Sequence, residues 1–197
     1  MNNKYELTNV SIDFMGKRLY QIKALRSFWN VKKWDLGWFI EKEKNLSVSG
    51  NAWVFGNASV FGNAIVSDNA WVYGDASIYD NAIVFGNAIV SDNARVYDNA
   101  RVSDNATVSG DAKVYGNAKV SGDAIVSDNA RVYDNARAFG DACVYGNVRV
   151  YNDAWVYSNA DARLNDNAWL LAKNNYTNSI TIELSPEQIK KVRELLK

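Results

Sequence analysis

The chain has 197 residues, which is enough for one domain with a sizeable core and small appendages. Its 22 basic and 22 acidic side chains cancel, so composition gives no general attraction to nucleic acid or to an anionic membrane. A single cysteine excludes an internal disulfide framework, and neither a secretory signal nor a membrane-spanning run of about 20 apolar residues is visible.

Residues 1–47 lack the repeat that follows, and we expect them to form a small N-terminal β leader that caps the next domain. The stretches YELTNVSIDF and KRLYQIKAL alternate like short strands, with MGK as the turn between them. A cap is needed because stacked repeats expose unpaired backbone at their ends. The alternative is a module that binds a ligand or a partner. In either case Trp29, Trp34 and Trp38 need neighbours for their rings.

Residues 48–161 repeat a six-residue unit, V-x-[GDN]-[ND]-A-x, nineteen times in frame. After an insertion at 162–163, one more unit ends at residue 169. A period of six cannot keep one side of a helix apolar, and the Asn, Asp and Gly residues favour turns. Each unit is therefore predicted to be a short strand with Val pointing inward, followed by a turn. Three units close a coil of 18 residues, and nearly seven stacked coils make a parallel β-helix.

The repeat at 48–169 resembles the hexapeptide-repeat family, whose fold is a left-handed parallel β-helix and whose members are often trimers. The preceding stretch LYQIKALRSFWNVKKWDLGWFIEKEKNLS is similar to the leader of an uncharacterised subgroup from bacteria and their phages. The resemblance implies an all-β, left-handed fold and a homo-oligomer, with a trimer favoured. It also suggests a phage-derived protein.

The family is best known for acyltransferases, which generally use a histidine as general base. This chain contains no histidine, so the residue suited to that role is missing. Cys143 likewise has no histidine to activate it as a nucleophile. We therefore expect no enzymatic activity, no cofactor and no metal site.

Residues on either side of each inward Val point outward, so the repeat predicts three flat faces. One of them, the uncharged face, carries no charge over six coils, and an uncharged, partly aromatic surface of that length predicts a contact. The contact is either with the leader or with another subunit. Its candidate residues are Trp53, Phe55, Trp71, Tyr73, Ile89 and Ile125. A second face, the mixed face, carries polar, apolar and charged residues and is predicted to meet solvent over much of its length.

The third face, the Tyr/Arg face, has an aromatic column and, in its last four coils, a cation beside each ring. Its candidate ligand-binding residues are Arg95, Tyr97, Lys113, Tyr115, Arg131, Tyr133, Arg149 and Tyr151. In one interpretation the tyrosines stack and the cations pair with Asp residues at the corners, which only stabilises the sheet. In the other, cations and phenols together bind an anionic partner such as a phosphate or carboxylate.

Residues 170–197 predict a polar loop, a short strand SITIEL and a C-terminal α-helix beginning near Ser185 and Pro186. A helix of about 12 residues is marginal alone, so it must dock on its own solenoid or on a neighbouring subunit. Its apolar stripe, a further candidate interface, consists of Ile189, Val192, Leu195 and Leu196.

Together these features predict a non-catalytic, self-associating binding protein. It would sequester an anionic, nucleotide-like small molecule or block a host protein, in the cytoplasm (the host's, if a phage encodes it) and without contact to a membrane. Extended nucleic-acid binding is not expected, because residues 48–169 carry 14 acidic but only 8 basic side chains. The alternatives are a structural spacer in a virion or on a surface, and a divergent acyltransferase without the usual histidine.

Overall fold

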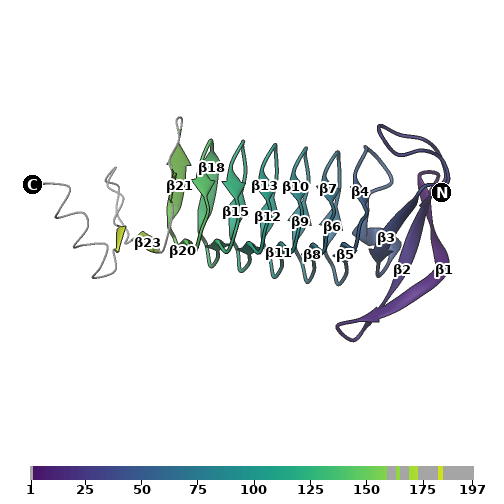
Figure 1. The fold of residues 1–197 in the computed structure, drawn as a ribbon, viewed down its shortest axis with the longest axis horizontal. Coiled ribbons are helices and arrows are strands. Elements are labelled where there is room, and N and C mark those ends of the chain that lie inside the picture. Colours follow the sequence, from purple (N-terminus) through teal and green to yellow (C-terminus); the bar gives the residue numbers. More distant parts are fainter. Residues whose placement is uncertain (1, 159–162, 165–168, 173–181, 184–197) are drawn as a thin grey trace, which may run out of the picture.

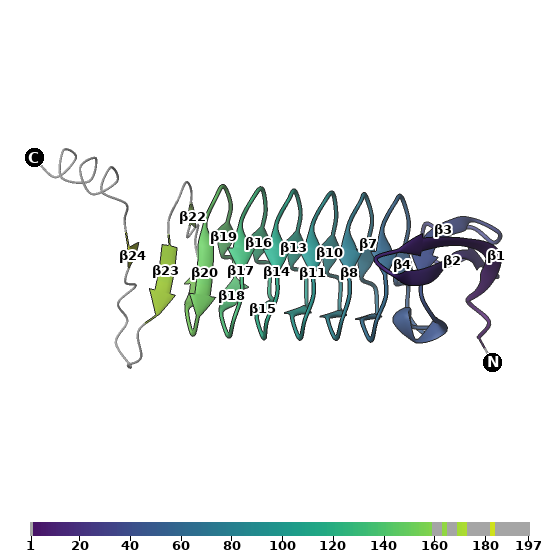
Figure 2. The same ribbon diagram turned by 90° about the horizontal axis from the view of Figure 1, so that it is seen from below.

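A computed structural model describes residues 2–158, 163–164, 169–172 and 182–183. The fold is a parallel β-solenoid of about seven coils, with an antiparallel sheet at its N-terminal end (Figure 1). Seen from a second side, the coils remain stacked along one long axis and the N-terminal strands lie across the end of the stack (Figure 2). This confirms the predicted all-β architecture and the capping role of the leader.

The strands of the solenoid form three sheets, one for each predicted face. The uncharged face consists of β4 (Trp53–Val54), β7 (Trp71–Val72), β10 (Ile89–Val90), β13 (Thr107–Val108), β16 (Ile125–Val126), β19 (Cys143–Val144) and β22 (Arg163–Leu164). The mixed face consists of β6 (Ile65–Val66), β9 (Ile83–Val84), β12 (Arg101–Val102), β15 (Lys119–Val120), β18 (Arg137–Gly140) and β21 (Trp155–Ser158). The Tyr/Arg face consists of β5 (Ser59–Val60), β8 (Ser77–Ile78), β11 (Arg95–Val96), β14 (Lys113–Val114), β17 (Arg131–Val132), β20 (Arg149–Asn152) and β23 (Trp169–Ala172).

The invariant residues of the repeat form the core and the corners of the solenoid. From Val54 to Val150 the inward residue of each unit is fully buried, and so is the alanine at each corner. Each strand pairs with the strand 18 residues further along, as in Val90 with Val108. The third residue of a unit adopts a left-handed backbone, for example φ 57° at Asp98. Asp and Gly tolerate that conformation, which explains their alternation at this position.

The start of the repeat differs from the prediction. Val48 is 45% exposed and does not point inward, whereas Leu46 is buried and pairs with Val66. Leu46 and Val66 are 20 residues apart, whereas paired residues of the later coils are 18 apart. The first coil therefore contains two extra residues, which lie within residues 47–51. The sequence match of Val48 to the repeat is real, but its environment is that of an irregular entry to the solenoid.

The leader folds as a hairpin joined to a third strand. Strands β1 (Tyr5–Phe14) and β2 (Lys17–Ala24) are antiparallel, as predicted, and a two-residue turn at Met15 and Gly16 links them with positive φ at both. Strand β3 (Leu36–Ile40) pairs antiparallel with β2 and parallel with β5. The leader thus occupies the edge of the Tyr/Arg sheet that the first coil would leave unpaired. A 3-10 turn, η1 (Glu43–Asn45), leads into the solenoid.

Two polar side chains of the leader close the open end of the core. The Lys4 ammonium is fully buried and donates to the carbonyl oxygens of Ser47 at 3.0 Å and Ala52 at 2.8 Å. The Tyr5 hydroxyl donates to the backbone carbonyl oxygens of Glu43 and Leu46, just before the first coil. Burial, and secondarily Arg26, lowers the pKa of Lys4 to about 8. Burial, and secondarily Glu43, raises the pKa of Tyr5.

We expect the free energy of unfolding to rise as the pH increases from about 8 toward 10. In this range the unfolded chain keeps the Lys4 proton, whose ordinary pKa is 10.5, while the folded chain releases it, so alkali favours folding. The gain is at most about 3 kcal/mol. Above pH 10 the sign reverses, because the unfolded chain loses its tyrosine protons at the ordinary pKa of 10.0, while Tyr5 and the stacked tyrosines with raised pKa, such as Tyr97, keep theirs in the folded chain.

Urea denaturation from about pH 7 to about pH 11 measures this curve. The variant Lys4→Met keeps most of the apolar stem and removes the titrating group, so it should lose the rise but keep the fall. A rise of the same size in Lys4→Met would assign it to another group.

At the other end, β23 pairs antiparallel with β24 (Ile182–Glu183), which lies within the predicted SITIEL strand. The predicted helix with Ile189, Val192, Leu195 and Leu196 lies outside the described residues. Among the residues that are described, no helix is long and apolar enough to cross a membrane.

Candidate functional site

The candidate residues of the Tyr/Arg face lie together, as the 18-residue coil predicts. Backbone pairing aligns Arg95, Lys113, Arg131 and Arg149 in one column. In the next column six rings stack, with centroids 4.9–5.4 Å apart and planes within 9° of parallel. The stack consists of Phe61, Tyr79, Tyr97, Tyr115, Tyr133 and Tyr151. The stacking predicted by the first interpretation is therefore present.

The first interpretation also predicts that the cations pair with the corner carboxylates, and among the described residues Arg95, Lys113 and Arg131 do not. Within the described part of the chain, Arg95, Lys113 and Arg131 have no salt bridge, and the ion pairs found there all lie in the leader. The corner carboxylates accept backbone N–H groups of the next coil instead. Asp98 accepts from Gly116 at 3.0 Å, and Asp134 accepts from Asn152 at 3.1 Å.

Tyr79, Tyr97, Tyr115 and Tyr133 of this face stay protonated at neutral pH. Burial, and secondarily the neighbouring Tyr79 and Tyr115, raises the pKa of Tyr97 to about 12. Burial is also the main cause of the raised pKa of Tyr79, Tyr115 and Tyr133. The rings are partly exposed, but stacking occupies their faces. What this surface offers a ligand is therefore a row of ring edges beside a row of cations.

The leader covers the first coil of the uncharged face. Trp53 is only 3% exposed, because Phe28 and Tyr5 pack on it with ring centroids at 5.4 and 6.4 Å. The predicted contact of this face with the leader is confirmed here. Further along the same face, Ile125 is 42% exposed, so the leader does not cover it.

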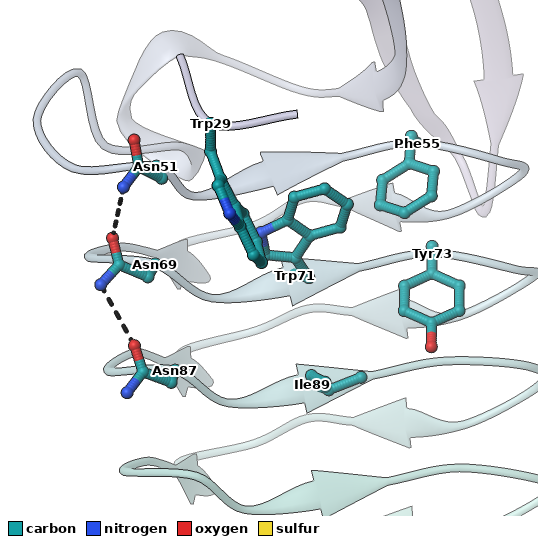
Figure 3. A pocket seen from close by; sticks show the side chains of 8 residues that line it. All are labelled: Trp29, Asn51, Phe55, Asn69, Trp71, Tyr73, Asn87 and Ile89. Carbon is teal, nitrogen blue, oxygen red and sulfur yellow. Dashed lines mark hydrogen bonds between the residues drawn. The ribbon is translucent and has the colours of Figure 1, made fainter. Parts of the chain in front are cut away.

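A hollow of about 590 Å³ lies where the leader ends on the uncharged face (Figure 3). It is formed by the leader, by residues that lie in or directly after β4, β7 and β10, and by one row of corners. The lining residues are Trp29, Asn51, Phe55, Asn69, Trp71, Tyr73, Asn87 and Ile89. None of these side chains carries a charge.

The rings of the hollow meet edge to face. Trp29 and Trp71 are nearly perpendicular, at 85°, with centroids 4.6 Å apart. Phe55 is perpendicular to Trp71 and stacks on Tyr73, each at 5.0 Å. The pyrrole edge of Trp71 faces Trp29 (Figure 3), and its buried Nε1 has no hydrogen-bond acceptor.

A ladder of carboxamides forms one wall of the hollow. Asn51 donates to Asn69 at 2.9 Å and Asn69 donates to Asn87 at 3.1 Å (Figure 3). The ladder follows from the 18-residue coil, which returns an Asn or Asp to this corner in every coil. Sequence reasoning did not assign these residues to a site, because Asn occurs at the same place in most coils. The sequence contained two signals for the hollow: the uncharged face, whose candidates include Phe55, Trp71, Tyr73 and Ile89, and Trp29, a leader tryptophan that needs a neighbour.

The other two leader tryptophans lie elsewhere. Trp34 is 57% exposed, with the ammonium groups of Lys33 and Lys23 at 4.5 and 5.2 Å from its ring. Trp38 packs edge to face against Phe39. Cys143 is half-buried, with its Sγ 3.7 Å from the Asp141 carbonyl oxygen. Across the described residues, no group of His, Cys, Asp and Glu side chains could hold a metal ion.

A comparison with protein-family models finds the YdcK beta solenoid repeat at residues 58–74, 76–92, 94–110, 100–116 and 142–158. All of these segments lie in stacked coils of the structure, so the match and the fold agree on a repeat β-solenoid protein. No curated protein matches the chain.

Proposed function

We propose that this repeat β-solenoid protein works by binding rather than by catalysis, and that its Tyr/Arg face takes an anionic ligand. The observation that carries the proposal is the column of Arg95, Lys113 and Arg131, which have no acidic partner in the described chain. Like charges directly opposite on adjacent strands destabilise a sheet, and strands lie about 4.8 Å apart. A bound anion relieves that repulsion.

The arrangement suits a compact ligand with several negative charges, such as a nucleotide with two or three phosphates. Arginine offers paired donors that match a phosphate, and successive coils present a cation to each phosphate in turn. An extended nucleic acid fits less well, because corner residues such as Asp98 and Asp134 border the column. A chain without histidine would hold such a ligand without converting it, which amounts to sequestration.

Charge removal from the Tyr/Arg face tests the proposal. Calorimetric titration with ATP and with inorganic pyrophosphate at low salt should show saturable binding by the wild type. Lys113→Gln combined with Arg131→Gln should weaken binding at least tenfold, or about 1.4 kcal/mol, and higher salt should weaken it further. The melting temperature should not fall, since these side chains carry no salt bridge in the described structure and their removal relieves the repulsion within the column.

The matched control removes the same charge from the mixed face, with Arg101→Gln and Lys119→Gln, which pair with each other across β12 and β15. It should leave the affinity for ATP unchanged. Absence of binding to both probes would overturn the proposal. A large drop in melting temperature for the first pair would favour a purely structural ladder in a spacer protein.

We further propose that the chain is a left-handed hexapeptide-repeat protein that forms a homotrimer in a cytoplasm, the host's if a phage encodes it. The six-residue period supports the family, and the leader's likeness to a phage and bacterial subgroup supports the origin. Exposed Ile125 and Ile65, at 42% and 40%, supply apolar surface for a subunit contact. Native mass spectrometry measures the assembly, and a monomer at micromolar concentration would contradict it.

A further inference from the structure

We infer that the hollow between Trp29 and the uncharged face is a second binding site, and that its ligand is a neutral carbohydrate. The hollow is built on β4, β7 and β10, which belong to a different sheet from the Tyr/Arg face. The inference therefore does not depend on the anionic ligand proposed above. Three features carry it: a fixed aromatic platform, a wall of carboxamides and the absence of charge.

Trp29 provides the platform. Trp29 is 66% exposed, yet backbone hydrogen bonds hold the short turn in which it lies. Phe28 and Val31 form a β-bridge around it, and its own backbone has φ 41°. The indole N–H edge of Trp71 faces the Trp29 ring (Figure 3), where a weak N–H to π contact replaces the missing acceptor. One face of Trp29 is thus held from below, while the other remains open to a ligand.

The ring geometry excludes a flat aromatic ligand inserted between two rings. Such a ligand needs parallel rings with a ring's thickness between them, whereas Trp29 and Trp71 are perpendicular and in contact. A single exposed indole face suits a saturated ring, because polarised C–H groups pack against the electron-rich face. Phe55 and Tyr73 extend the apolar floor beside it (Figure 3).

The carboxamide wall supplies the hydrogen bonds that sugar hydroxyls need. A carboxamide has two N–H donors and two acceptor positions. Asn69 uses one of each in the ladder, so one of each remains. A hydroxyl both donates and accepts, and can therefore use both. The wall spans three coils, or about 10 Å on the usual strand spacing, which is enough for more than one sugar unit.

The lining also argues against charged ligands. A bound anion or cation needs an opposite charge or a dense set of donors, and no lining side chain is charged. The ligand class that matches a neutral hollow with one aromatic face and an amide wall is an uncharged saccharide.

Titration with neutral oligosaccharides tests the inference, using cellohexaose, maltohexaose and the fully N-acetylated chitin hexamer as probes. We expect at least one of them to bind saturably and to change the tryptophan fluorescence. Trp29→Ala should weaken that binding at least tenfold while the melting temperature stays close to that of the wild type. Trp34→Ala is the matched control, because it removes a similarly exposed tryptophan that does not line the hollow.

Several results would overturn the inference. They are no binding of any of the three probes to the wild type, equal binding by Trp29→Ala, or an equal loss with Trp34→Ala. A change of native mass caused by Trp29→Ala would show that a second copy of the chain occupies the hollow. ATP titration of Trp29→Ala separates the two proposed sites: affinity for ATP should be unchanged, whatever becomes of the saccharide.

Discussion

Val108→Asp is expected to leave the chain without a stable fold. Val108 lies on β13 near the middle of the solenoid and is fully buried between Val90 and Val126 of the adjacent coils. An aspartate there would place a carboxylate in an apolar column with no cation within the core to pair with it. Burial of an unpaired carboxylate, or of a carboxyl group that takes up a proton to avoid the charge, costs several kcal/mol in addition to the lost valine packing, which is comparable with the roughly 5–15 kcal/mol by which a domain is stable.

Thr107→Asp is the control that isolates this cause. It introduces the same side chain one position earlier, where the residue points outward and is only half-buried. We expect Thr107→Asp to give soluble protein with near-normal stability. Soluble expression and the circular dichroism spectrum of the two variants measure the contrast. Normal folding of Val108→Asp would mean that the inward assignment of the repeat is wrong.

Gly37→Val is expected to detach the leader from the first coil. Gly37 is buried in β3, and a Cβ atom added there would lie 2.5 Å from Ile22 Cγ1 and 2.6 Å from the Val54 carbonyl oxygen. The Ile22 side chain could move, but the Val54 oxygen belongs to the backbone of the first regular coil. Overpacking typically costs 1–3 kcal/mol, and because one clash is with backbone we expect a loss of about 3 kcal/mol or more.

The consequence extends beyond the site of the clash. Strand β3 covers the edge of β5, and Lys4 and Tyr5 close the end of the core. When the leader is displaced, the first coil loses its neighbour, and in a stack of repeats stability depends on each neighbouring contact. Urea denaturation followed by tryptophan fluorescence should show a lower midpoint and a transition at low denaturant that reports the leader.

Gly16→Asn is the control for this variant. Gly16 lies in the hairpin turn with φ 74° and open space around the added Cβ, and asparagine tolerates that backbone. We expect its effect to stay below about 1 kcal/mol. If Gly37→Val is as mild as Gly16→Asn, the close packing of β3 on the solenoid does not hold in solution.

The repeat predicted most of the solenoid because each invariant residue type indicates a particular local environment or backbone conformation. Val marks the inward position, Ala a tight corner, and Asn or Asp a turn, and these hold from the second repeat unit, which begins at Val54, onward. Val48 satisfies the same pattern but is exposed, because Leu46 of the leader already occupies the inward position at that end of the core. The repeat pattern alone does not reveal this. A match to the repeat predicts that a residue points inward only when the units before and after it are both in frame.

The candidate surfaces were predicted only in part. The 18-residue coil placed Arg95, Lys113 and Arg131 in one column, since parallel pairing in register follows directly from the period. It did not show whether their charges are neutralised. The corner aspartates are close in sequence to these cations, but their oxygens bond to the backbone of the next coil. Whether a corner carboxylate pairs with a cation or with backbone N–H groups depends on the direction of its side chain, which the sequence does not encode.

By itself, the sequence determined the coil, the three faces and the residues on each, because a period of six encodes which side chains point inward and which stack. Only the tertiary structure decided where the leader lies and which part of the uncharged face it leaves open. The hollow depends on the contact of Trp29 with Trp71, which joins a non-repeating segment to the repeat. No period relates two such segments, so only the packing of the leader against the coils could bring those rings together.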